Sequence, residues 1–145
     1  GMSFNTDFGC LARSIMEGVA FEARTVLDAF NGFVDIKEIR MSGGATKSPL
    51  WSQIQADIYG RNTTSLEEGE CTVLGAAILG GFGAGVFSSM EEATDHLVNK
   101  VATFEPNAKN VEIYNELFDA FKSAYKALDE GGFYRQLAAF TNRHA

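Results

Sequence analysis

The stretch Arg40-Met-Ser-Gly-Gly-Ala-Thr-Lys-Ser-Pro-Leu-Trp51 joins a short apolar run to an amphipathic segment. Ser48 is typical of a helix N-cap, because its hydroxyl can accept a hydrogen bond from a helix N–H. Pro49 suits the first helical position, where its missing N–H costs nothing. The pattern therefore predicts a strand over 36–41 and a helix from Pro49 to about Gly60. The apolar residues of the strand are Ile36, Ile39 and Met41, and those of the helix are Leu50, Trp51, Ile54 and Ile58.

The loop between these two elements, 42–47, has the composition of an anion site. Unpaired backbone N–H groups point outward at a helix N-terminus, where the helix dipole favours negative charge. Gly43 and Gly44 have no Cβ, so a phosphate or a ribose can approach the backbone closely. The spacing matches neither Gly-x-Gly-x-x-Gly nor Gly-x-x-x-x-Gly-Lys-Ser/Thr, which excludes the dinucleotide and Walker motifs. From the residues alone, a plain tight turn remains an alternative to an anion site.

The segment from Ser42 to Gly60 resembles the adenosine motif of the FGGY carbohydrate kinases. In the xylulose-kinase branch that motif is Gly-Gly-Gly-Ala-x-Ser-x-x-Trp-x-Gln-x-x-Ala-Asp-x-x-Gly. Ser42 replaces the first glycine here, and the serine falls one residue late. The matching residues are Gly43, Gly44, Ala45, Trp51, Gln53, Ala56, Asp57 and Gly60.

Two further segments resemble the same family, in the same order along the chain. Leu11-Ala-Arg-Ser-Ile-Met-Glu-Gly-Val-Ala-Phe21 is similar to the family's Leu-x-Arg-Ala-x-Leu-Glu-Gly-x-Ala-Phe helix. Glu70-Cys-Thr-Val-Leu-Gly-Ala-Ala-Ile-Leu79 is similar to its Glu-x-x-x-Leu-Gly-Ala-Ala helix. Three ordered motifs are much harder to obtain by chance than one.

The resemblance implies a fold and an activity. FGGY kinases transfer the γ-phosphate of ATP to a sugar or polyol hydroxyl, with Mg²⁺ bridging the phosphates. Their fold resembles actin and hexokinase, so the expected class is α/β: a partial actin-like or ribonuclease-H-like ATPase domain, rich in helix, with a few parallel strands. By the same resemblance, Gly43, Gly44 and Ala45 approach the α-phosphate and ribose, and Ser48 lies near the adenine or ribose.

The family's catalytic aspartate, phosphate-binding hairpin and sugar contacts lie upstream of these motifs. The candidate aspartates do not match the position of the base, so no catalytic residue is assigned; they are Asp7, Asp28, Asp35 and Asp57. We expect this chain to be the carboxyl-terminal part of such a kinase, a truncated product or an isolated subdomain, inactive without the missing amino-terminal portion. The alternative is a non-catalytic interaction module. The residues of the adenosine motif favour xylulose as substrate only because they resemble the xylulose-kinase branch.

Composition narrows the function classes further. A chain of 145 residues, with 46% hydrophobic residues, can bury a core, and we expect a single domain over 1–145, with Gly1 a cloning remnant. The net charge of −7, without a basic cluster, argues against nucleic-acid binding. No apolar run is long enough to cross a membrane and no signal peptide is visible, so we expect a cytoplasmic protein that is able to self-associate. Cys10 and Cys71 lack metal-ligand spacing and are expected to be buried free thiols, and no metal ligand is assigned.

The remaining elements follow from periodicity and caps. A long first helix, capped by Asn5 or Thr6, carries one broad apolar stripe and ends at Asn31-Gly32. A close neighbour is expected at Gly18. A strand over 62–66 should pair in parallel with the first. The stripe residues are Phe8, Leu11, Ile15, Val19, Ala23, Val26, Leu27 and Phe30.

The second half of the chain is predicted to be mostly helical. A helix over 72–82, rich in glycine and alanine, should pack closely against another backbone, after an acidic loop over 67–70. The alternative for this helix is a wall beside a bound nucleotide. A short helix follows Ser88 or Ser89 and carries His96, which we interpret as a surface residue. An extended piece over 101–104 precedes a helix with an aromatic core stripe from about Asn110. A last helix over 133–141 follows Gly131-Gly132. The stripe residues are Tyr114, Leu117, Phe118, Phe121, Tyr125 and Leu128.

Overall fold

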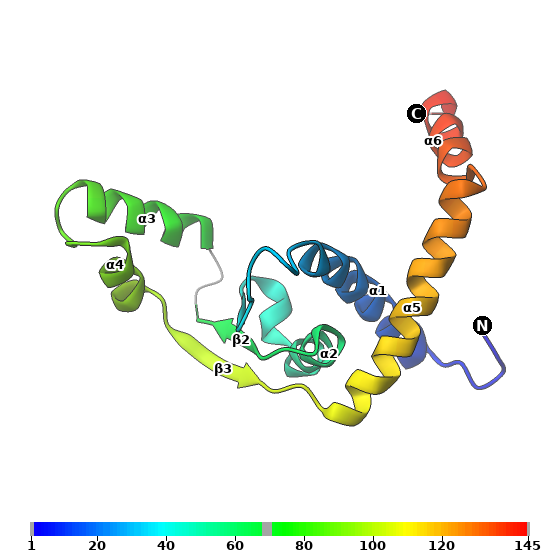
Figure 1. Cartoon of the computed structure of the whole chain (residues 1–145), viewed down its shortest axis with the longest axis horizontal. Coiled ribbons are helices and arrows are strands. Elements are labelled where there is room, and N and C mark those ends of the chain that lie inside the picture. Colours follow the sequence, from blue (N-terminus) through cyan, green and yellow to red (C-terminus); the bar gives the residue numbers. More distant parts are fainter. Residues whose placement is uncertain (1, 68–70, 145) are drawn as a thin grey trace. The chain divides into compact units, whose positions relative to one another are not determined.

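The structure is a computed structural model, and it describes residues 2–67 and 71–144 (Figure 1). The chain divides into two compact units, Gly1–Val111 and Glu112–Ala145, which are described separately. In chain order, the elements are α1 (Phe8–Ala29), β1 (Ile39–Met41), the 3₁₀ turn η1 (Gly44–Lys47), α2 (Pro49–Tyr59), β2 (Thr63–Leu66), α3 (Cys71–Gly83), α4 (Met90–Leu97), β3 (Lys100–Phe104), α5 (Ala108–Glu130) and α6 (Phe133–His144).

A small mixed sheet lies at the centre of the first unit. Its strand order is β1-β2-β3, with β1 and β2 parallel, as predicted, and β2 and β3 antiparallel. The first strand is shorter than predicted, because it begins at Ile39 and not at Ile36. The carbonyl oxygen of Ile36 accepts a hydrogen bond from Arg61 Nη1 at 3.0 Å and takes no part in the ladder.

The pairing of β2 with β3 contains a register shift between Ser65 and Leu66. Ser65 is opposite Ala102, but Leu66 is opposite Lys100, so Val101 is an extra residue on β3. A bulge of this kind changes the face of the sheet to which the following side chain points. The shift therefore places Lys100 on the face of the sheet that carries Glu38, whose carboxylate it contacts at 2.8 Å.

Helix α2 supplies more buried residues to this unit than any other described element. Ser48 caps it, Pro49 is its first residue, and Gly60 ends it in the left-handed conformation at φ 61°, all as predicted. Ile54 and Ile58 are fully buried, and α2 contacts both β2 and β3. Burial of two isoleucine side chains stabilises the unit by roughly 3–6 kcal/mol before entropy is subtracted.

Helix α1 corrects several expectations. Its N-cap is Asp7, whose Oδ1 accepts from the Cys10 N–H at 2.7 Å, whereas the Thr6 hydroxyl oxygen accepts from the Ser3 N–H. A Cβ at Gly18 would meet nothing within 4 Å, so the expected close neighbour is absent among the described residues. The buried residues of the helix are Ala20 and Phe21, and most of the predicted stripe is exposed.

Helices α3 and α4 lie side by side (Figure 1). The prediction that the small residues of α3 pack against a backbone is wrong for the described residues: Gly75 and Gly80 face open space, and a Cβ at Gly81 would meet the ring of Phe87 at 2.8 Å. Ser89 caps α4 by accepting from the Glu92 N–H at 3.0 Å. The hydrogen bond from the Ser88 hydroxyl lowers the pKa of Glu92.

The two cysteines, the acidic loop and His96 were also the subject of predictions. Cys10 and Cys71 are free thiols but exposed, which contradicts their predicted burial. Residues 68–70 of the predicted acidic loop lie outside the described residues, as does Glu70, which begins the third motif. His96 is exposed on α4 and its Nδ1 lies 2.9 Å from the Glu92 carbonyl oxygen, in line with the surface interpretation.

The second unit contains most of α5 and all of α6. Gly132, at φ 74°, makes the turn between them, and Tyr125 and Tyr134 contact across it with ring centroids 5.3 Å apart. Of the predicted aromatic stripe, Tyr114 and Phe118 are buried, and Phe118 stacks on Phe121. Leu117, Tyr125 and Leu128 are exposed, and α6 continues to His144, beyond its predicted end.

Candidate functional site

The loop between β1 and α2 is built around one glycine conformation. Gly43 has φ 88° and ψ −170°, a region that side-chain-bearing residues avoid. Its carbonyl oxygen accepts from both the Thr46 N–H at 3.1 Å and the Thr46 hydroxyl at 2.8 Å. These two bonds close the 3₁₀ turn η1, which the sequence had not suggested.

Free hydrogen-bond donors lie at the start of this turn. The first N–H groups of a helical turn have no partner within it, and Gly43 provides no side-chain cap. In the part of the chain that the structure describes, the N–H groups of Gly44 and Ala45 therefore have no acceptor and are open to a ligand. Gly44 is exposed, and a Cβ there would meet nothing within 4 Å. A negatively charged group can thus approach this backbone without steric conflict.

The N-terminus of α2 contributes less than the sequence suggested. The Ser48 hydroxyl accepts from the Trp51 N–H at 3.3 Å, and the Ser48 carbonyl accepts from the Ser52 N–H at 3.0 Å. Pro49 has no N–H, so only the Leu50 N–H lacks an intrahelical partner. The open donors of the site consequently come mainly from η1.

The position of the loop in the sheet fits a ligand site. It follows the carboxyl end of β1, and β1 is parallel to its neighbour β2. In open α/β sheets, ligands bind in the crevice outside the carboxyl ends of the parallel strands. The structure thus places Gly43, Gly44, Ala45 and Ser48, the four predicted site residues, at that edge of the sheet.

The other charged candidates have structural partners. Glu17 pairs with Arg13 at 2.8 Å, and Arg24 with Asp28 at 3.9 Å. The hydrogen bond from the Cys10 N–H lowers the pKa of Asp7. The candidate aspartates pair as follows: Asp7 with the Cys10 N–H, Asp28 with the Asn31 amide, Asp35 with Lys37, and Asp57 with three donors.

Asp57 has a role that the sequence did not reveal. It is buried, with 2% of its surface exposed. Its Oδ1 accepts from Gln53 Nε2 at 2.9 Å and from the Asn107 N–H at 2.8 Å, and its Oδ2 accepts from Asn110 Nδ2 at 2.7 Å. Gln53 also donates to the Glu105 carbonyl oxygen at 2.9 Å. The carboxylate therefore ties α2, and with it the loop before α2, to the segment that leads into α5.

Glu38 lies just before β1, at the end of that strand opposite the candidate loop, and its carboxylate holds the three strands together. Its Oε1 accepts from the Thr64 hydroxyl at 2.6 Å and from Lys100 Nζ at 2.8 Å, and its Oε2 lies 3.3 Å from Arg40 Nε. These contacts, led by the bond from Lys100, lower the pKa of Glu38 to about 2. The cluster fixes the strand from which the candidate loop departs.

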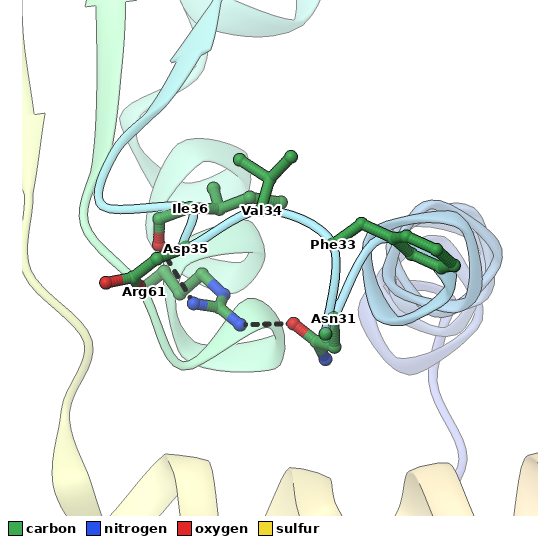
Figure 2. Close-up of a pocket in the computed structure, with 7 residues that line it drawn as sticks. Asn31, Phe33, Val34, Asp35, Ile36 and Arg61 are labelled. Atoms are coloured by element: carbon green, nitrogen blue, oxygen red, sulfur yellow. Dashed lines mark hydrogen bonds between the residues drawn. The ribbon is translucent and has the colours of Figure 1, made fainter.

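A pocket of about 370 Å³ lies at the opposite ends of these strands (Figure 2). Arg61 donates to the Ile36 carbonyl oxygen at 3.0 Å and to Asn31 Oδ1 at 2.9 Å, and these bonds hold the segment between α1 and β1. Asn31 and Ile36 precede β1, and Arg61 precedes β2, so the pocket lies at the amino ends of these two parallel strands and is separate from the candidate loop. In residues 2–67 and 71–144, no three His, Cys, Asp or Glu side chains gather as metal ligands, and no helix is long and apolar enough to span a membrane.

The family model for the FGGY family of carbohydrate kinases, C-terminal domain, matches residues 1–84. The chain belongs to this family. The match includes α1, the candidate loop and α2, so the family segment contains the site described above. The resemblance found in the sequence is thereby confirmed.

FGGY kinases are also found by sequence and structure comparison. A xylulose kinase of Bacillus subtilis (strain 168) is 36% identical over 114 residues, which are 78% of this chain and 23% of that protein. An autoinducer-2 kinase of Escherichia coli (strain K12) is 35% identical over 118 residues, 80% of this chain and 22% of that protein. This FGGY chain spans about a quarter of the length of these relatives.

Solved structures agree with the predicted fold class. The xylulose kinase of Rhodospirillum rubrum superposes with a TM-score of 0.79 at 26% identity, over 90% of this chain and 27% of that one. The Plasmodium falciparum glycerol kinase with ADP gives a TM-score of 0.70 at 26% identity, over 85% of this chain and 26% of that one. The FGGY chain therefore has part of the actin-like ATPase fold and is rich in helix, as predicted; its small sheet is mixed, because β3 joins the parallel pair in the antiparallel direction.

Proposed function

We propose that this chain is the carboxyl-terminal, ATP-binding portion of a kinase that transfers the γ-phosphate of ATP to a hydroxyl of xylulose or a related sugar or polyol. The observation that carries the proposal is the loop after β1, where the open N–H groups of Gly44 and Ala45 lie within the family-matched segment. A related fold, the Plasmodium glycerol kinase, was solved with ADP, which supports a nucleotide as the ligand.

Each residue of the loop has a task in this proposal. The N–H groups of Gly44 and Ala45 donate to the α-phosphate, and the missing Cβ atoms of Gly43 and Gly44 let phosphate and ribose approach the backbone. The Ser48 hydroxyl oxygen already accepts from Trp51, so its proton is available to a ribose or adenine acceptor. These contacts position the nucleotide, and phosphoryl transfer depends chiefly on positioning and charge stabilisation.

The proposal assigns Mg²⁺ mainly to phosphate oxygens. Mg²⁺ is usually bound by one or two carboxylates together with substrate phosphates, and it neutralises their charge. The described residues gather no metal-ligand group of their own. In this proposal, the carboxylates and the catalytic base come from the amino-terminal portion of the kinase.

We therefore expect the isolated chain to lack kinase activity. By resemblance, the catalytic aspartate and the sugar contacts belong to that other portion, and the four candidate aspartates of this chain have structural partners. Turnover of a sugar by the pure chain would contradict this expectation. A cytoplasmic location and self-association stay predictions.

A non-catalytic interaction module is the second candidate function. It is favoured by the many large apolar side chains at the surface, including Phe8 and Phe33. In that case the fold is kept for association, and the loop after β1 has no ligand. Nucleotide binding separates the two candidates.

The test is calorimetric titration of the chain with ATP and with ADP in the presence of Mg²⁺. Gly44→Asp places a carboxylate where the phosphate should lie, and no protein atom lies within 4 Å of the new Cβ, so a loss of binding would not come from a clash with the protein. Gly18→Asp is the matched control, because it adds the same side chain in open space on α1.

Two results are informative. Nucleotide binding that Gly44→Asp abolishes and Gly18→Asp preserves would support the proposal. No binding to the unmodified chain up to millimolar nucleotide, with folding confirmed by circular dichroism, would overturn it and leave the interaction module as the better function.

A further inference from the structure

Asn31 is the single asparagine of the chain that is followed by a glycine. An asparagine can react with its own backbone, because the nitrogen of the next residue can attack the side-chain amide carbon and close a five-membered imide ring. Glycine has no Cβ to hinder that approach. Asn31 and Gly32 are both exposed, in the turn that leads from α1 towards β1. The sequence thus places a reactive pair at an accessible point of the fold.

The nitrogen that would attack makes no hydrogen bond. Gly32 lies beyond the end of α1, with φ 96°. The N–H of Asn31 donates to the Asp28 carbonyl oxygen at 3.1 Å, and the N–H of Phe33 donates to the Phe30 carbonyl oxygen at 3.0 Å. In the described part of the chain, the Gly32 N–H between them has no acceptor. No bond therefore has to break before this nitrogen can react.

The side-chain amide of Asn31 is held at both ends. Its Oδ1 accepts from Arg61 Nη2 at 2.9 Å, and its Nδ2 donates to Asp28 Oδ1 at 3.0 Å. Because a guanidinium only donates and an ionised carboxylate only accepts, these partners fix which end of the amide is the oxygen. Arg61 Nη1 also donates to the Ile36 carbonyl oxygen at 3.0 Å, which holds the guanidinium in place (Figure 2).

These contacts match the charges that develop during ring closure. When the Gly32 nitrogen attacks Asn31 Cγ, negative charge develops on Oδ1, which faces the guanidinium of Arg61. A donor that is already in position at such an oxygen lowers the barrier. The Asp28 carboxylate faces Nδ2 and stabilises the positive charge that this nitrogen acquires before it leaves. The pocket of about 370 Å³, lined in part by Asn31, Gly32 and Arg61, admits the water that the reaction consumes.

We infer that Asn31-Gly32 is a site of spontaneous deamidation, and that Arg61 promotes the reaction. The bond from the Gly32 nitrogen to Asn31 Cγ forms, and the bond from Cγ to Nδ2 breaks. The proton of the Gly32 N–H passes to water, while Nδ2 takes a proton from water and leaves as ammonia. Water then opens the imide at Cγ to give aspartate, or at the main-chain carbonyl to give isoaspartate. The net reaction consumes one water and releases one ammonia, and it is independent of nucleotide binding.

Both products change the turn before β1. The partners of Arg61 are the Asn31 amide and the Ile36 carbonyl, which carry no charge. Aspartate at position 31 converts the first contact into a charge-assisted bond, which is stronger, and removes the donor to Asp28. Isoaspartate adds one backbone carbon between α1 and β1, the strand from which the candidate loop departs.

The test follows deamidation over time in mildly alkaline buffer. Mass spectrometry of proteolytic peptides measures the conversion of each asparagine, and chromatography separates the aspartyl and isoaspartyl forms. Arg61→Gln removes the guanidinium. Arg13→Gln is the matched control, because it removes the same charge near the other end of α1. Circular dichroism checks folding, and the unmodified chain in urea gives the rate without structure, so one comparison needs no variant.

We expect residue 31 of the folded chain to deamidate at least tenfold faster than any other asparagine, and faster than in urea. Arg61→Gln should lower this rate at least threefold, and Arg13→Gln should leave it unchanged. An equal or higher rate in a folded Arg61→Gln variant would overturn the inference, because the guanidinium would then protect the amide or have no effect. A rate in the folded chain that does not exceed the rate in urea would overturn it as well.

Discussion

Replacement of Asp57 by alanine removes the acceptor for three donors at once. The donors are Gln53 Nε2, the Asn107 N–H and Asn110 Nδ2, at 2.7–2.9 Å. A buried donor without a partner costs about 1–3 kcal/mol. The three donor residues keep some contact with solvent, so the low end applies to each. We expect Asp57→Ala to lower the free energy of unfolding by about 3 kcal/mol, at about 1 kcal/mol per donor.

Urea unfolding measured by fluorescence suits this prediction, because Trp51 is the single tryptophan and lies in the same helix. With an m-value of about 1–3 kcal/mol/M, the midpoint should fall by roughly 1–3 M. Asp57→Asn should cost less, because the amide oxygen still accepts and the Asn110 amide can rotate to accept in turn. Asp95→Ala, an exposed site on α4, is the control and should change stability by less than about 0.5 kcal/mol. A loss below about 1 kcal/mol in Asp57→Ala would refute the view that this carboxylate ties α2 to the start of α5.

Three further predictions concern the loop and the strands beside it. Because the pKa of Glu38 is lowered from 4.5 to about 2 in the folded protein, its contribution to stability is present above pH 4.5 and lost as the pH falls towards 2. The stability difference between the unmodified chain and Glu38→Gln should therefore shrink between pH 5 and pH 2 in urea titrations, and a constant difference would contradict the assignment. Gly43→Ala should destabilise by about 1–3 kcal/mol through backbone strain, whereas Gly44→Ala, without a positive φ and with open space at its Cβ, should not; equal thermal shifts would count against this reasoning. Ser48→Ala should lower the free energy of unfolding by about 1 kcal/mol through loss of the N-cap, and Ser48→Asp should keep most of that stability. Equal thermal unfolding of the Ser48→Ala variant and the unmodified chain would show that the cap contributes nothing.

Local features of the fold could be predicted from the sequence because their causes are local. Ser48, Pro49 and Gly60 determine the bounds of α2 within one turn of each end. The site loop could be located, but its 3₁₀ turn could not, because the turn depends on the conformation of Gly43. The groups that donate hydrogen bonds to Asp57 lie up to 53 residues away in sequence, so no local pattern could indicate them.

The errors have a common physical origin. Periodicity shows that α1 has an apolar face, but it does not show whether another element covers that face. The same limit applies to Cys10, whose burial was inferred from its residue type, and to Gly18, whose expected neighbour is absent among the described residues. Each of these predictions assumed that apolar or small residues find their partners within the chain described.

The bulge between β2 and β3 bears on how relatives should be aligned. The bulge absorbs Val101 as an extra residue, so that Lys100 is opposite Leu66 and on the Glu38 face. If Val101 were deleted, a regular ladder would still place Lys100 opposite Leu66, with its ammonium beside the carboxylate. A homologue one residue shorter at this point could thus keep the ion pair without any other change. Conversely, an insertion that the ladder does not absorb as a bulge would turn Lys100, the residue of β3 before it, to the opposite face. Alignments of this region should therefore allow a one-residue gap at position 101 and match the lysine before it to the glutamate that precedes β1.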